Sequence, residues 1–499
     1  MKRRQFLNTS LAAAAAVSLP SQQALAAALA ELSKVAGDVN AVTGDGAQVT
    51  LERAAVQELS DRLRGRLLLP GYEGYEKARH VLNAGIDRHP ALIVQPSGAA
   101  DVCSAVTFAR ERNLLLAVKC GGHSYGGKST CEGGMQIDLS TFRNARVDPF
   151  SKTANIAGGS LLAGLDHEAL NFGLVTTAGT VSHTGVGGLT LGGGFGRLAR
   201  RFGLALDNVK SVDIVTADGK LRRASATENP DLYWGVRGGG GNFGVVTNFE
   251  FALHEMDRQV IGGDMVYPLS SMRDVLNMYA DYLPEAPDDL YLDFGVTSRM
   301  DSKDGICMVH ACYSGPPGDA EKVLAPIYKA GKPLDDGIKA VDYEAIQRSW
   351  DNTDPRNYGE YIKAGFINEF PGKLVDAIVE NFETFDNMGT TLFFQCSGGA
   401  IGRVPADATA FAHRKSLANL MNVVEYPLDD TGEGVTYGRA RWKAYEPFTD
   451  GWYTNEVDRE SPQAINANYQ GNFERLVRVK NRYDPTNLFR LNANVRPTV

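Results

Sequence analysis

Residues 119–124 read Lys-Cys-Gly-Gly-His-Ser, and two further glycines follow at Gly126 and Gly127. The apolar run 114–118 leads into this turn. Because glycine has no Cβ atom, it permits positive φ angles and lets backbone N–H groups approach an anionic ligand. His123 stands in the middle of the loop, where a site built only for phosphate has no use for an imidazole. The stretch therefore predicts a binding loop for a tethered cofactor.

Two further glycine-dense blocks follow the histidine loop. Residues 180–196 read TVSHTGVGGLTLGGGFG, and residues 237–244 read RGGGGNFG. Three such blocks indicate a long ligand with a pyrophosphate group that passes close to exposed backbone. The last block contains a G-x-G-x-x-G match, but the strand-like run 245–251 follows it where the dinucleotide fingerprint needs a helix. We interpret that match as coincidental.

The residues around the histidine loop have an α/β pattern. A short apolar run over 91–95 is followed by a helix signal at Ser97, with apolar residues spaced as on one helical face, and by a returning strand over 114–119. This pattern predicts a βαβ-like unit with the loop at its end, where α/β folds commonly bind ligands. The Asp218-Gly219 pair predicts a tight hairpin.

The chain of 499 residues exceeds the usual size of a single core, so two domains are expected. Its character changes near residue 256, where strand-like and helical runs begin to alternate and glycine clusters become rare. The predicted organisation is a signal peptide (1–26), a helical extension (27–60), a glycine-rich binding domain (61–255), a substrate domain (256–457) and a C-terminal return to the binding domain (458–499).

The N-terminus predicts an export signal. A twin-arginine pattern, Lys2-Arg3-Arg4, precedes an apolar run over 11–19, and Ala24-Leu25-Ala26 supplies the small residues of a cleavage site. The apolar run is too short to span a bilayer, which takes about 20 residues. Twin-arginine export carries folded proteins, so it suits a protein that binds its cofactor before export. We expect a periplasmic or secreted protein without a membrane anchor.

Charge and cysteine content limit the partners. The formal net charge is −8, and loss of residues 1–26 leaves 48 basic against 59 acidic residues, which argues against nucleic acid and anionic membranes. The six cysteines form no C-x-x-C pair, so neither a zinc site nor another metal site is expected. Cys120 and Cys131 flank the histidine loop and either pair across it or stay free. The expected partner is a small-molecule substrate.

Several motifs occur together in order. The His123 loop and the block GVGGLTLGGGFG are followed by Asp207-Asn208-Val209, by the third glycine block, and by the tail YDPTNLFRLNANVRP at 483–497. Together they resemble the FAD-linked oxidases of the berberine bridge enzyme-like group, within the vanillyl-alcohol oxidase superfamily. The resemblance implies an α+β fold with a two-subdomain FAD-binding domain. It also implies a substrate domain whose antiparallel sheet, covered by helices, lies over the flavin ring.

The resemblance also implies how FAD is held. His123 matches the histidine that bonds covalently to the 8α-methyl group of the flavin, and Val181 stands where many members carry a second linking cysteine, so a single link is expected. His183, close by in sequence, is expected to serve loop structure. The remaining residues implied to bind the cofactor are Gly121, Gly122, Ser124, Gly126, Gly127, Gly187, Gly188, Gly192, Gly193, Gly194, Gly196, Asn242, Gly244, Val245, Asn492 and Asn494.

Three residues are candidates for catalysis. Tyr453 matches the G-x-Y-x-N segment that supplies the base in the family's sugar and alcohol oxidases, although a phenol needs a pKa lowered from about 10 for that role. Lys363, Arg439 or the polar edge of the flavin could lower it; the alternative is a packed tyrosine with a satisfied hydroxyl. Gln395 matches a substrate-face position, and Tyr361 is a further candidate that could equally belong to the core.

The resulting hypothesis is an exported oxidase. It transfers hydride from a C–H group of an alcohol, sugar or amine to covalently bound FAD, and dioxygen reoxidises the flavin to give hydrogen peroxide. A dehydrogenase that uses a quinone or protein acceptor is the alternative within enzymes. A catalytically silent flavin- or ligand-binding protein is the alternative outside them.

Overall fold

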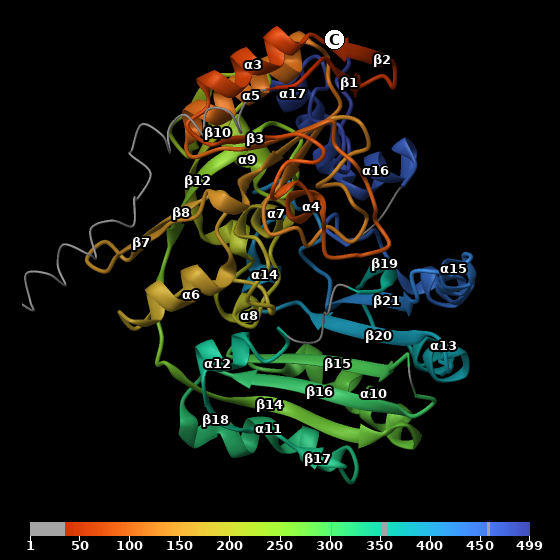
Figure 1. Ribbon diagram of the computed structural model, residues 1–499. Coiled ribbons are helices and arrows are strands. Elements are labelled where there is room, and N and C mark those ends of the chain that lie inside the picture. Colours follow the sequence, from red (N-terminus) through yellow and green to blue (C-terminus); the bar gives the residue numbers. More distant parts are fainter. Residues whose placement is uncertain (1–34, 301, 352–356, 457–459) are drawn as a thin grey trace, which may run out of the picture.

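The computed structural model describes residues 35–300, 302–351, 357–456 and 460–499. The described chain folds into a glycine-rich half, which contains residues 35–255 and the C-terminal residues 460–499, and a half built on one large sheet (Figure 1). The predicted signal peptide, residues 1–26, lies outside the described residues.

A four-stranded sheet carries the histidine loop. Its order is β3 (Arg66–Leu68), β4 (Leu92–Gln95), β6 (Met135–Asp138), β5 (Leu116–Lys119), and β6 runs parallel to both β4 and β5. Helix α5 (Ala99–Glu111) connects β4 to β5 and buries its apolar stripe against the sheet. The predicted βαβ-like unit is confirmed, with the loop leaving the end of β5.

A five-stranded antiparallel sheet completes this half. Its order is β11 (Leu221–Ser225), β10 (Val209–Val215), β12 (Val245–Ala252), β8 (Thr153–Ala157), β7 (Ala145–Asp148). The predicted hairpin at Asp218-Gly219 joins β10 to β11, and Gly219 has the positive φ of +77° that the turn requires. Helix α17 (Phe473–Tyr483) returns from the C-terminus and packs beside α9 (Pro230–Val236) in the same core.

The extension predicted to be helical over 27–60 is different in its described part. Strands β1 (Val39–Val42) and β2 (Gln48–Leu51) form an antiparallel hairpin, and only α3 (Arg53–Arg62) is helical. The turn between the strands contains Asp45 and Gly46, which has a φ of +89°. Alternation of polar and β-branched residues in β2 fits a half-exposed strand better than a helix.

The large sheet has eight strands and is antiparallel throughout. The strands are β14 (Gln259–Pro268), β15 (Leu290–Ser298), β16 (Gly305–Tyr313), β17 (Asp335–Asp336), β18 (Lys339–Asp342), β19 (Gly359–Ile367), β20 (Gly389–Cys396) and β21 (Ala418–Tyr426). Their order is β17-β14-β16-β15-β20-β21-β19, and β18 also pairs with β14.

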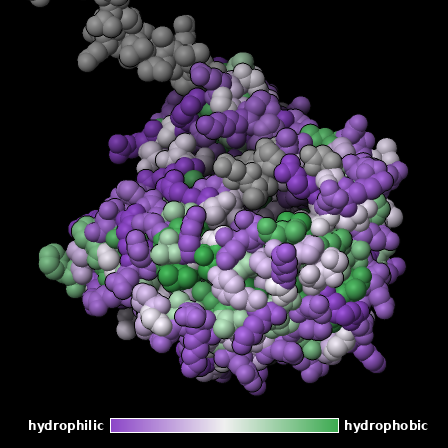
Figure 2. Space-filling view, turned by 90° about the horizontal axis from the view of Figure 1, so that it is seen from below, coloured by the Kyte–Doolittle hydropathy of each residue, from purple (hydrophilic) through white to green (hydrophobic). Residues whose placement is uncertain are grey.

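Helices cover one face of this sheet. They are α10 (Met272–Tyr282), α11 (Ala320–Lys329), α13 (Gly372–Asn381) and α15 (Glu433–Tyr445). Phe294 and Phe394, opposite each other in the sheet, point into the core beneath these helices with Tyr279 of α10. Seen from below, this half of the molecule presents mostly polar side chains with small apolar areas between them (Figure 2).

The cysteines form no disulfide. All six are free: Cys120 Sγ lies 3.6 Å from the carbonyl oxygen of Ser160, and Cys131 Sγ lies 3.5 Å from that of Met135. The pairing considered between Cys120 and Cys131 is therefore absent, because each thiol is directed at a backbone carbonyl of its own neighbourhood. Within the described ranges, no helix has both the length and the apolar character needed to cross a membrane.

Candidate active site

The first two glycine blocks meet backbone to backbone. A Cβ atom on Gly121 would lie 2.4 Å from the amide nitrogen of Gly185, and one on Gly185 would lie 2.4 Å from that of Gly121. Gly122 and Gly127 have φ angles of +76° and +67°, which only glycine adopts without strain. The half-buried Ser124 accepts a hydrogen bond from the backbone N–H of Lys128 at 2.8 Å. This crossing forms a wall of bare backbone, as expected for a nucleotide cofactor.

His123 lies at this crossing and touches a second histidine. Its Nε2 is 2.6 Å from Nδ1 of His183, and its Nδ1 is 3.5 Å from Oγ1 of Thr184. Nε2 of His183 in turn lies 3.3 Å from the carbonyl oxygen of Asp351, whose carboxylate accepts bonds from the N–H and Oγ of Ser182 at 3.0 and 2.7 Å. His183 thus orients the His123 ring, a more specific role than the loop structure expected of it.

The second block continues as α7 (Val186–Gly192) and a glycine turn. A Cβ on Gly192 would lie 2.2 Å from Oδ1 of Asn455, and one on Gly196 would lie 2.6 Å from the amide nitrogen of Gly179. Gly193 and Gly194 have φ angles of +155° and +90°. These four glycines thus let the turn pack tightly against neighbouring segments. Gly187 comes close to the Gly158 carbonyl, whereas a Cβ on Gly188 would meet no atom of another segment within 4 Å.

The third block binds the C-terminal tail. Asn242 is fully buried; its Nδ2 donates to the carbonyl oxygens of Gly239 and Ala493 at 2.7 and 2.9 Å, and its Oδ1 accepts from the N–H of Val495 at 3.1 Å. The Asn242 amide thus joins the third block to the tail and positions the tail. The expectation that Asn242 binds the cofactor stays a prediction.

Other residues predicted beside the third block divide in the same way. Val245 is buried in the core with Val215, and Gly244 allows close approach to the Val215 carbonyl, so both serve packing rather than side-chain contact with a ligand. Asn492 donates to the Gly241 carbonyl at 2.9 Å. Oδ1 of Asn494 is buried and has no hydrogen-bond partner among the described residues, so it fits an acceptor for a donor on a bound cofactor.

A row of polar residues crosses the uncovered face of the large sheet. Strand register places five side chains on this face, opposite to the one that packs under the helices: Asp264, His310, Asp293, Gln395 and Asn419. We call these five residues the polar row. Arg197, from the glycine-rich half, donates to Nε2 of His310 at 2.9 Å. The row therefore faces the glycine-rich half.

One end of the polar row touches Glu456. Asn419 Nδ2 donates to Oε2 of Glu456 at 2.6 Å, while Oδ1 of Asn419 and Oε1 of Gln395 are buried without partners among the described residues. Burial raises the pKa of the Glu456 carboxyl to about 7. Burial also raises the pKa of Asp293 to about 7, against the opposing effect of its bond from Tyr291. Glu456 was not among the predicted site residues.

Tyr453 is in the site region but not in the state expected of it. Its hydroxyl oxygen accepts bonds from the N–H of Gly194 and from Nδ2 of Asn455, both at 2.8 Å, and its ring packs 5.2 Å from that of Phe195. Burial raises the pKa of this phenol well above 10, opposite to the lowering that a base requires.

The cations proposed to lower the pKa of Tyr453 are engaged elsewhere. Lys363 forms an ion pair with Glu460, and Arg439 lies over the ring of Tyr361 at 6.0 Å. Neither cation is among the groups that shift the pKa of the Tyr453 phenol. A charged group that does so is Glu456, which raises this pKa further.

Tyr361 does not join the site. Phe366 of β19 pairs with Asn419, so its side chain lies on the same face of the sheet as the polar row. Tyr361 is five residues away on the same strand, so its side chain lies on the opposite, helix-covered face. Its ring packs against Gly438 of α15. The half-buried ring therefore packs against α15 on the face opposite to the polar row, and the catalytic role expected of Tyr361 stays a prediction that this placement does not favour.

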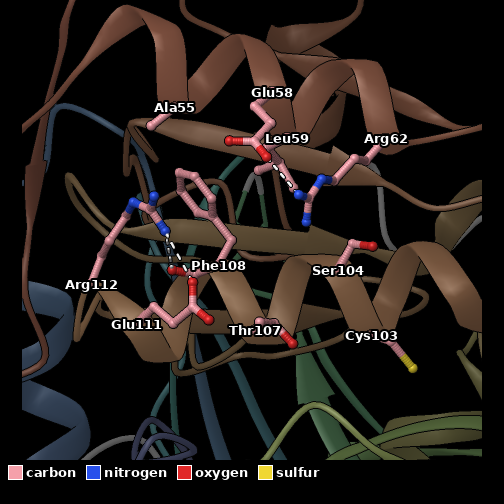
Figure 3. A pocket seen from close by; sticks show the side chains of 10 residues that line it. All are labelled: Ala55, Glu58, Leu59, Arg62, Cys103, Ser104, Thr107, Phe108, Glu111 and Arg112. Atoms are coloured by element: carbon pink, nitrogen blue, oxygen red, sulfur yellow. Dashed lines mark hydrogen bonds and ion pairs between the residues drawn. The ribbon is translucent and has the colours of Figure 1, made fainter.

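A surface cavity elsewhere is unrelated to these residues. It has a volume of about 430 Å³ and lies between α3 and α5, where Glu58–Arg62 and Glu111–Arg112 ion pairs line it (Figure 3). It includes none of the predicted cofactor or catalytic residues.

Comparisons with known proteins agree with this architecture. Residues 90–225 match the family model "FAD binding domain", and residues 452–496 match "Berberine and berberine like". An FAD-linked oxidoreductase of Dictyostelium discoideum is 31% identical over 452 residues, which cover 89% of this chain and 97% of that protein. Glucooligosaccharide oxidase of Sarocladium strictum is 27% identical, over 85% of this chain and 91% of its own.

The solved structures extend the likeness to three dimensions. The crystal structure of 6-hydroxy-D-nicotine oxidase from Arthrobacter nicotinovorans superposes with a TM-score of 0.80 at 26% identity, and the match covers 87% of this chain and 98% of that one. The α+β fold expected from the resemblance is confirmed, as is the FAD-binding domain. The chain belongs to the berberine bridge enzyme-like family of FAD-linked oxidoreductases.

Proposed function

We propose that this protein is an oxidase that removes hydride from a C–H group beside a hydroxyl or amine and passes it to FAD. The observation that carries the proposal is the arrangement of two surfaces around residues 451–456. On one side lies the glycine turn, which continues along the chain from the His123 crossing through α7, and on the other lies the polar row. Relatives named for the oxidation of glucooligosaccharide and of 6-hydroxy-D-nicotine support an alcohol or amine substrate.

We further propose that His123 holds the flavin covalently and alone. His123 lies at the crossing of the two glycine walls, its ring is oriented by His183 and Thr184, and Val181 offers no thiol for a second link. FAD supplies the two-electron acceptor, so the protein itself must orient the substrate and take up one proton. Dioxygen is the proposed final acceptor, with hydrogen peroxide as product.

The proposal includes export by the twin-arginine route. It is supported by Arg3 and Arg4, the short apolar run after them and the small residues at 24–26. A covalent tether suits an exported protein, because no FAD pool replaces a lost cofactor outside the cytoplasm. Replacing Arg3 and Arg4 by lysine should leave the full-length precursor in the cytoplasmic fraction, as judged by fractionation and mass.

Acid precipitation tests the cofactor and its link. The denatured wild-type protein should stay yellow, and the flavin should be found on the peptide that contains His123. The variant His123→Ala should release all its flavin to the supernatant. Colourless wild-type precipitate with free FAD in solution would overturn the covalent link.

Anaerobic mixing with substrates tests the reaction. Cellobiose, xylobiose, diacetylchitobiose, benzyl alcohol and 6-hydroxynicotine are suitable probes, and at least one should bleach the flavin. Addition of air should then restore the absorbance with one hydrogen peroxide per flavin. Bleaching without reoxidation by air would indicate a dehydrogenase, and no bleaching by any probe would favour a silent flavin-binding protein.

A further inference from the structure

We propose that Glu456, rather than Tyr453, removes the O–H or N–H proton of the substrate, and that Gln395 accepts a second hydrogen bond from the same molecule. This inference rests on the proposed oxidase function and assigns its proton acceptor and the polarity of its substrate. It comes from three oxygen atoms on neighbouring residues where the large sheet meets the glycine-rich half: Oε1 of Glu456, Oε1 of Gln395 and Oδ1 of Asn419.

The carboxyl group of Glu456 is fixed between the sheet and the glycine turn. On the sheet side, Asn419 of β21 donates to Oε2 at 2.6 Å, and Asn419 pairs with Gln395 of β20 in the strand register. On the other side, the backbone N–H of Glu456 donates to the carbonyl oxygen of Tyr453 at 3.1 Å. The neighbouring Asn455 donates to the Leu189 carbonyl of α7 at 3.2 Å. A molecule bound between sheet and turn would therefore meet this carboxyl.

Three acceptors of this cluster receive no hydrogen bond from the described residues. Gln395 is 8% exposed and Asn419 is fully buried, yet Oε1 of Gln395 and Oδ1 of Asn419 have no hydrogen-bond partner among the described residues. Within the same ranges, Oε1 of Glu456 also has no hydrogen-bond partner. Buried acceptors without donors are costly, and a polar ligand is one means of satisfying them. The cluster therefore fits a substrate that donates at least two hydrogen bonds, as the hemiacetal end of a sugar does.

Tyr453 instead holds the glycine turn in place. Its hydroxyl oxygen accepts one hydrogen bond from the N–H of Gly194 and one from Asn455. Its ring packs in a cluster with Phe195, Phe366 and Phe411. A phenol held in this way fixes the turn through Gly194. It has less freedom to accept a substrate proton than a carboxyl group with one unpaired oxygen.

The electrostatic surroundings of Glu456 contain few charges. From its own segment it faces the neutral phenol of Tyr453, and from β20 and β21 it faces the amides of Gln395 and Asn419. Lys363 on β19 is paired with Glu460. Among the described residues no cation lies beside it, and burial gives this carboxyl a pKa of about 7, which suits a base that works near neutral pH.

The proposed step conserves atoms and electrons. The C–H bond breaks with its electron pair, which leaves as hydride and reduces FAD by two electrons. The O–H or N–H proton moves to Glu456, which changes from carboxylate to carboxylic acid, and a C=O or C=N double bond forms. Dioxygen takes two electrons and one proton, those of the former hydride, from the reduced flavin and one further proton from water to become hydrogen peroxide, and Glu456 returns its own proton to water.

The test compares holoenzyme variants Glu456→Gln, Glu456→Asp and Tyr453→Phe with the exposed control Glu446→Gln. Anaerobic flavin reduction is followed against pH with whichever probe of the panel above bleaches the wild type fastest. In the wild type the rate should rise with pH through about 7, because the base acts as carboxylate. In Glu456→Gln the rate of flavin reduction should no longer rise with pH through about 7, and it should fall about 100-fold or more while substrate affinity changes much less. Glu456→Asp should recover part of the rate.

Infrared titration of the resting holoenzyme provides a readout without turnover. The wild type should show protonated-carboxyl absorption that disappears as the pH rises through about 7, with contributions from Glu456, Asp166 and Asp293. Glu456→Gln should lose one part of this absorption in the difference spectrum against the wild type, while Tyr453→Phe and Glu446→Gln keep all of it. Absorption unchanged in Glu456→Gln overturns the proposal whether or not any probe is oxidised. If a probe is oxidised, an undiminished rate in Glu456→Gln, or loss of the pH limb in Tyr453→Phe alone, also overturns it. Failure of all probes to bleach the wild type concerns the proposed function instead.

Discussion

Among single residues, the pair His123 and His183 offers a direct test of how the proposed cofactor link forms. The 2.6 Å contact fixes the imidazole of His123, and Ser182 holds the Asp351 segment that His183 touches. We predict that His183→Ala lowers the fraction of covalently bound flavin severalfold without loss of the fold. That fraction is measured from the absorbance of acid-precipitated protein after incubation with FAD.

His167→Ala is the matched control, since that exposed ring lies on α6 (Leu162–Leu170) and is paired with the Glu344 side chain at 3.3 Å. Equal retention of flavin in both variants would show that the His183 contact has no part in attachment.

The motifs of the sequence located the site region but did not indicate which side chains the fold brings together there. Tyr453 and Gln395 were found because a short motif and a strand end are visible in sequence. Glu456 was missed although it directly follows the G-x-Y-x-N segment, because a carboxylate in a polar segment gives no signal of burial. The placement of Tyr361 was not visible in the sequence for a different reason: the choice between two faces of β19 depends on pairing with β21, which one strand alone does not reveal.

Among elements, the crossing of the histidine loop with the start of α7 makes a sharp prediction about glycine. Gly185→Ala would put a Cβ atom 2.4 Å from the Gly121 amide nitrogen and 2.5 Å from Cys120 Sγ, so the two loops must separate. We expect this variant to lose most of its bound FAD, as measured by the ratio of flavin to protein absorbance after purification.

Gly164→Ala serves as the control for that experiment. Gly164 lies inside α6, and a Cβ there meets no atom of another segment within 4 Å. Alanine in a helix interior is more favourable than glycine by about 0.5–1 kcal/mol, so this variant should keep its FAD and melt slightly higher. A full complement of FAD in Gly185→Ala would contradict the proposed crossing.

Local patterns predicted some elements better than others. The βαβ-like unit around α5 and the hairpin at Gly219 followed from periodicity and turn chemistry, which act over a few residues. The hairpin of β1 and β2 was missed because its strands have only four residues each and look like a polar stretch. Their stability comes from packing: Ala41 and Leu51 are buried in the core that α5 also contacts.

For the molecule as a whole, polar side chains join the two halves. Arg197 donates to His310 and, through Nη1, to Gln347 at 2.7 Å; Gln347 donates to the buried carboxylate of Asp166 at 3.0 Å. Burial and the nearby Arg197 lower the pKa of His310 to about 4, so this imidazole is neutral. Its Nε2 accepts the hydrogen bond from the Arg197 guanidinium. Such distant pairings depend on the assembled fold, which explains why no sequence motif indicated them.

Buried carboxyls in this interface predict how stability depends on pH. Burial raises the pKa values of Asp166 and Asp293, like that of Glu456, to about 7. Between the unfolded value near 4 and about 7, the folded protein holds protons that the unfolded chain releases, so the free energy of unfolding falls as pH rises through this window. Removing one such group should make the fall shallower by at most about 1.4 kcal/mol per pH unit.

Asp293→Asn tests this, since the amide oxygen can still accept the N–H of Cys396 that Asp293 Oδ1 accepts at 2.7 Å. We predict that the variant gains melting temperature relative to the wild type as pH rises from 5 to 8 at fixed ionic strength. Asp148→Asn is the control: its exposed carboxyl has a pKa lowered by bonds from Ser151 and Phe150, so its contribution is complete above pH 5 and its melting curve should run parallel to that of the wild type. If the melting temperature of Asp293→Asn also ran parallel to that of the wild type from pH 5 to 8, Asp293 would be ionised in the folded protein throughout this range. The polar row would then carry a buried negative charge.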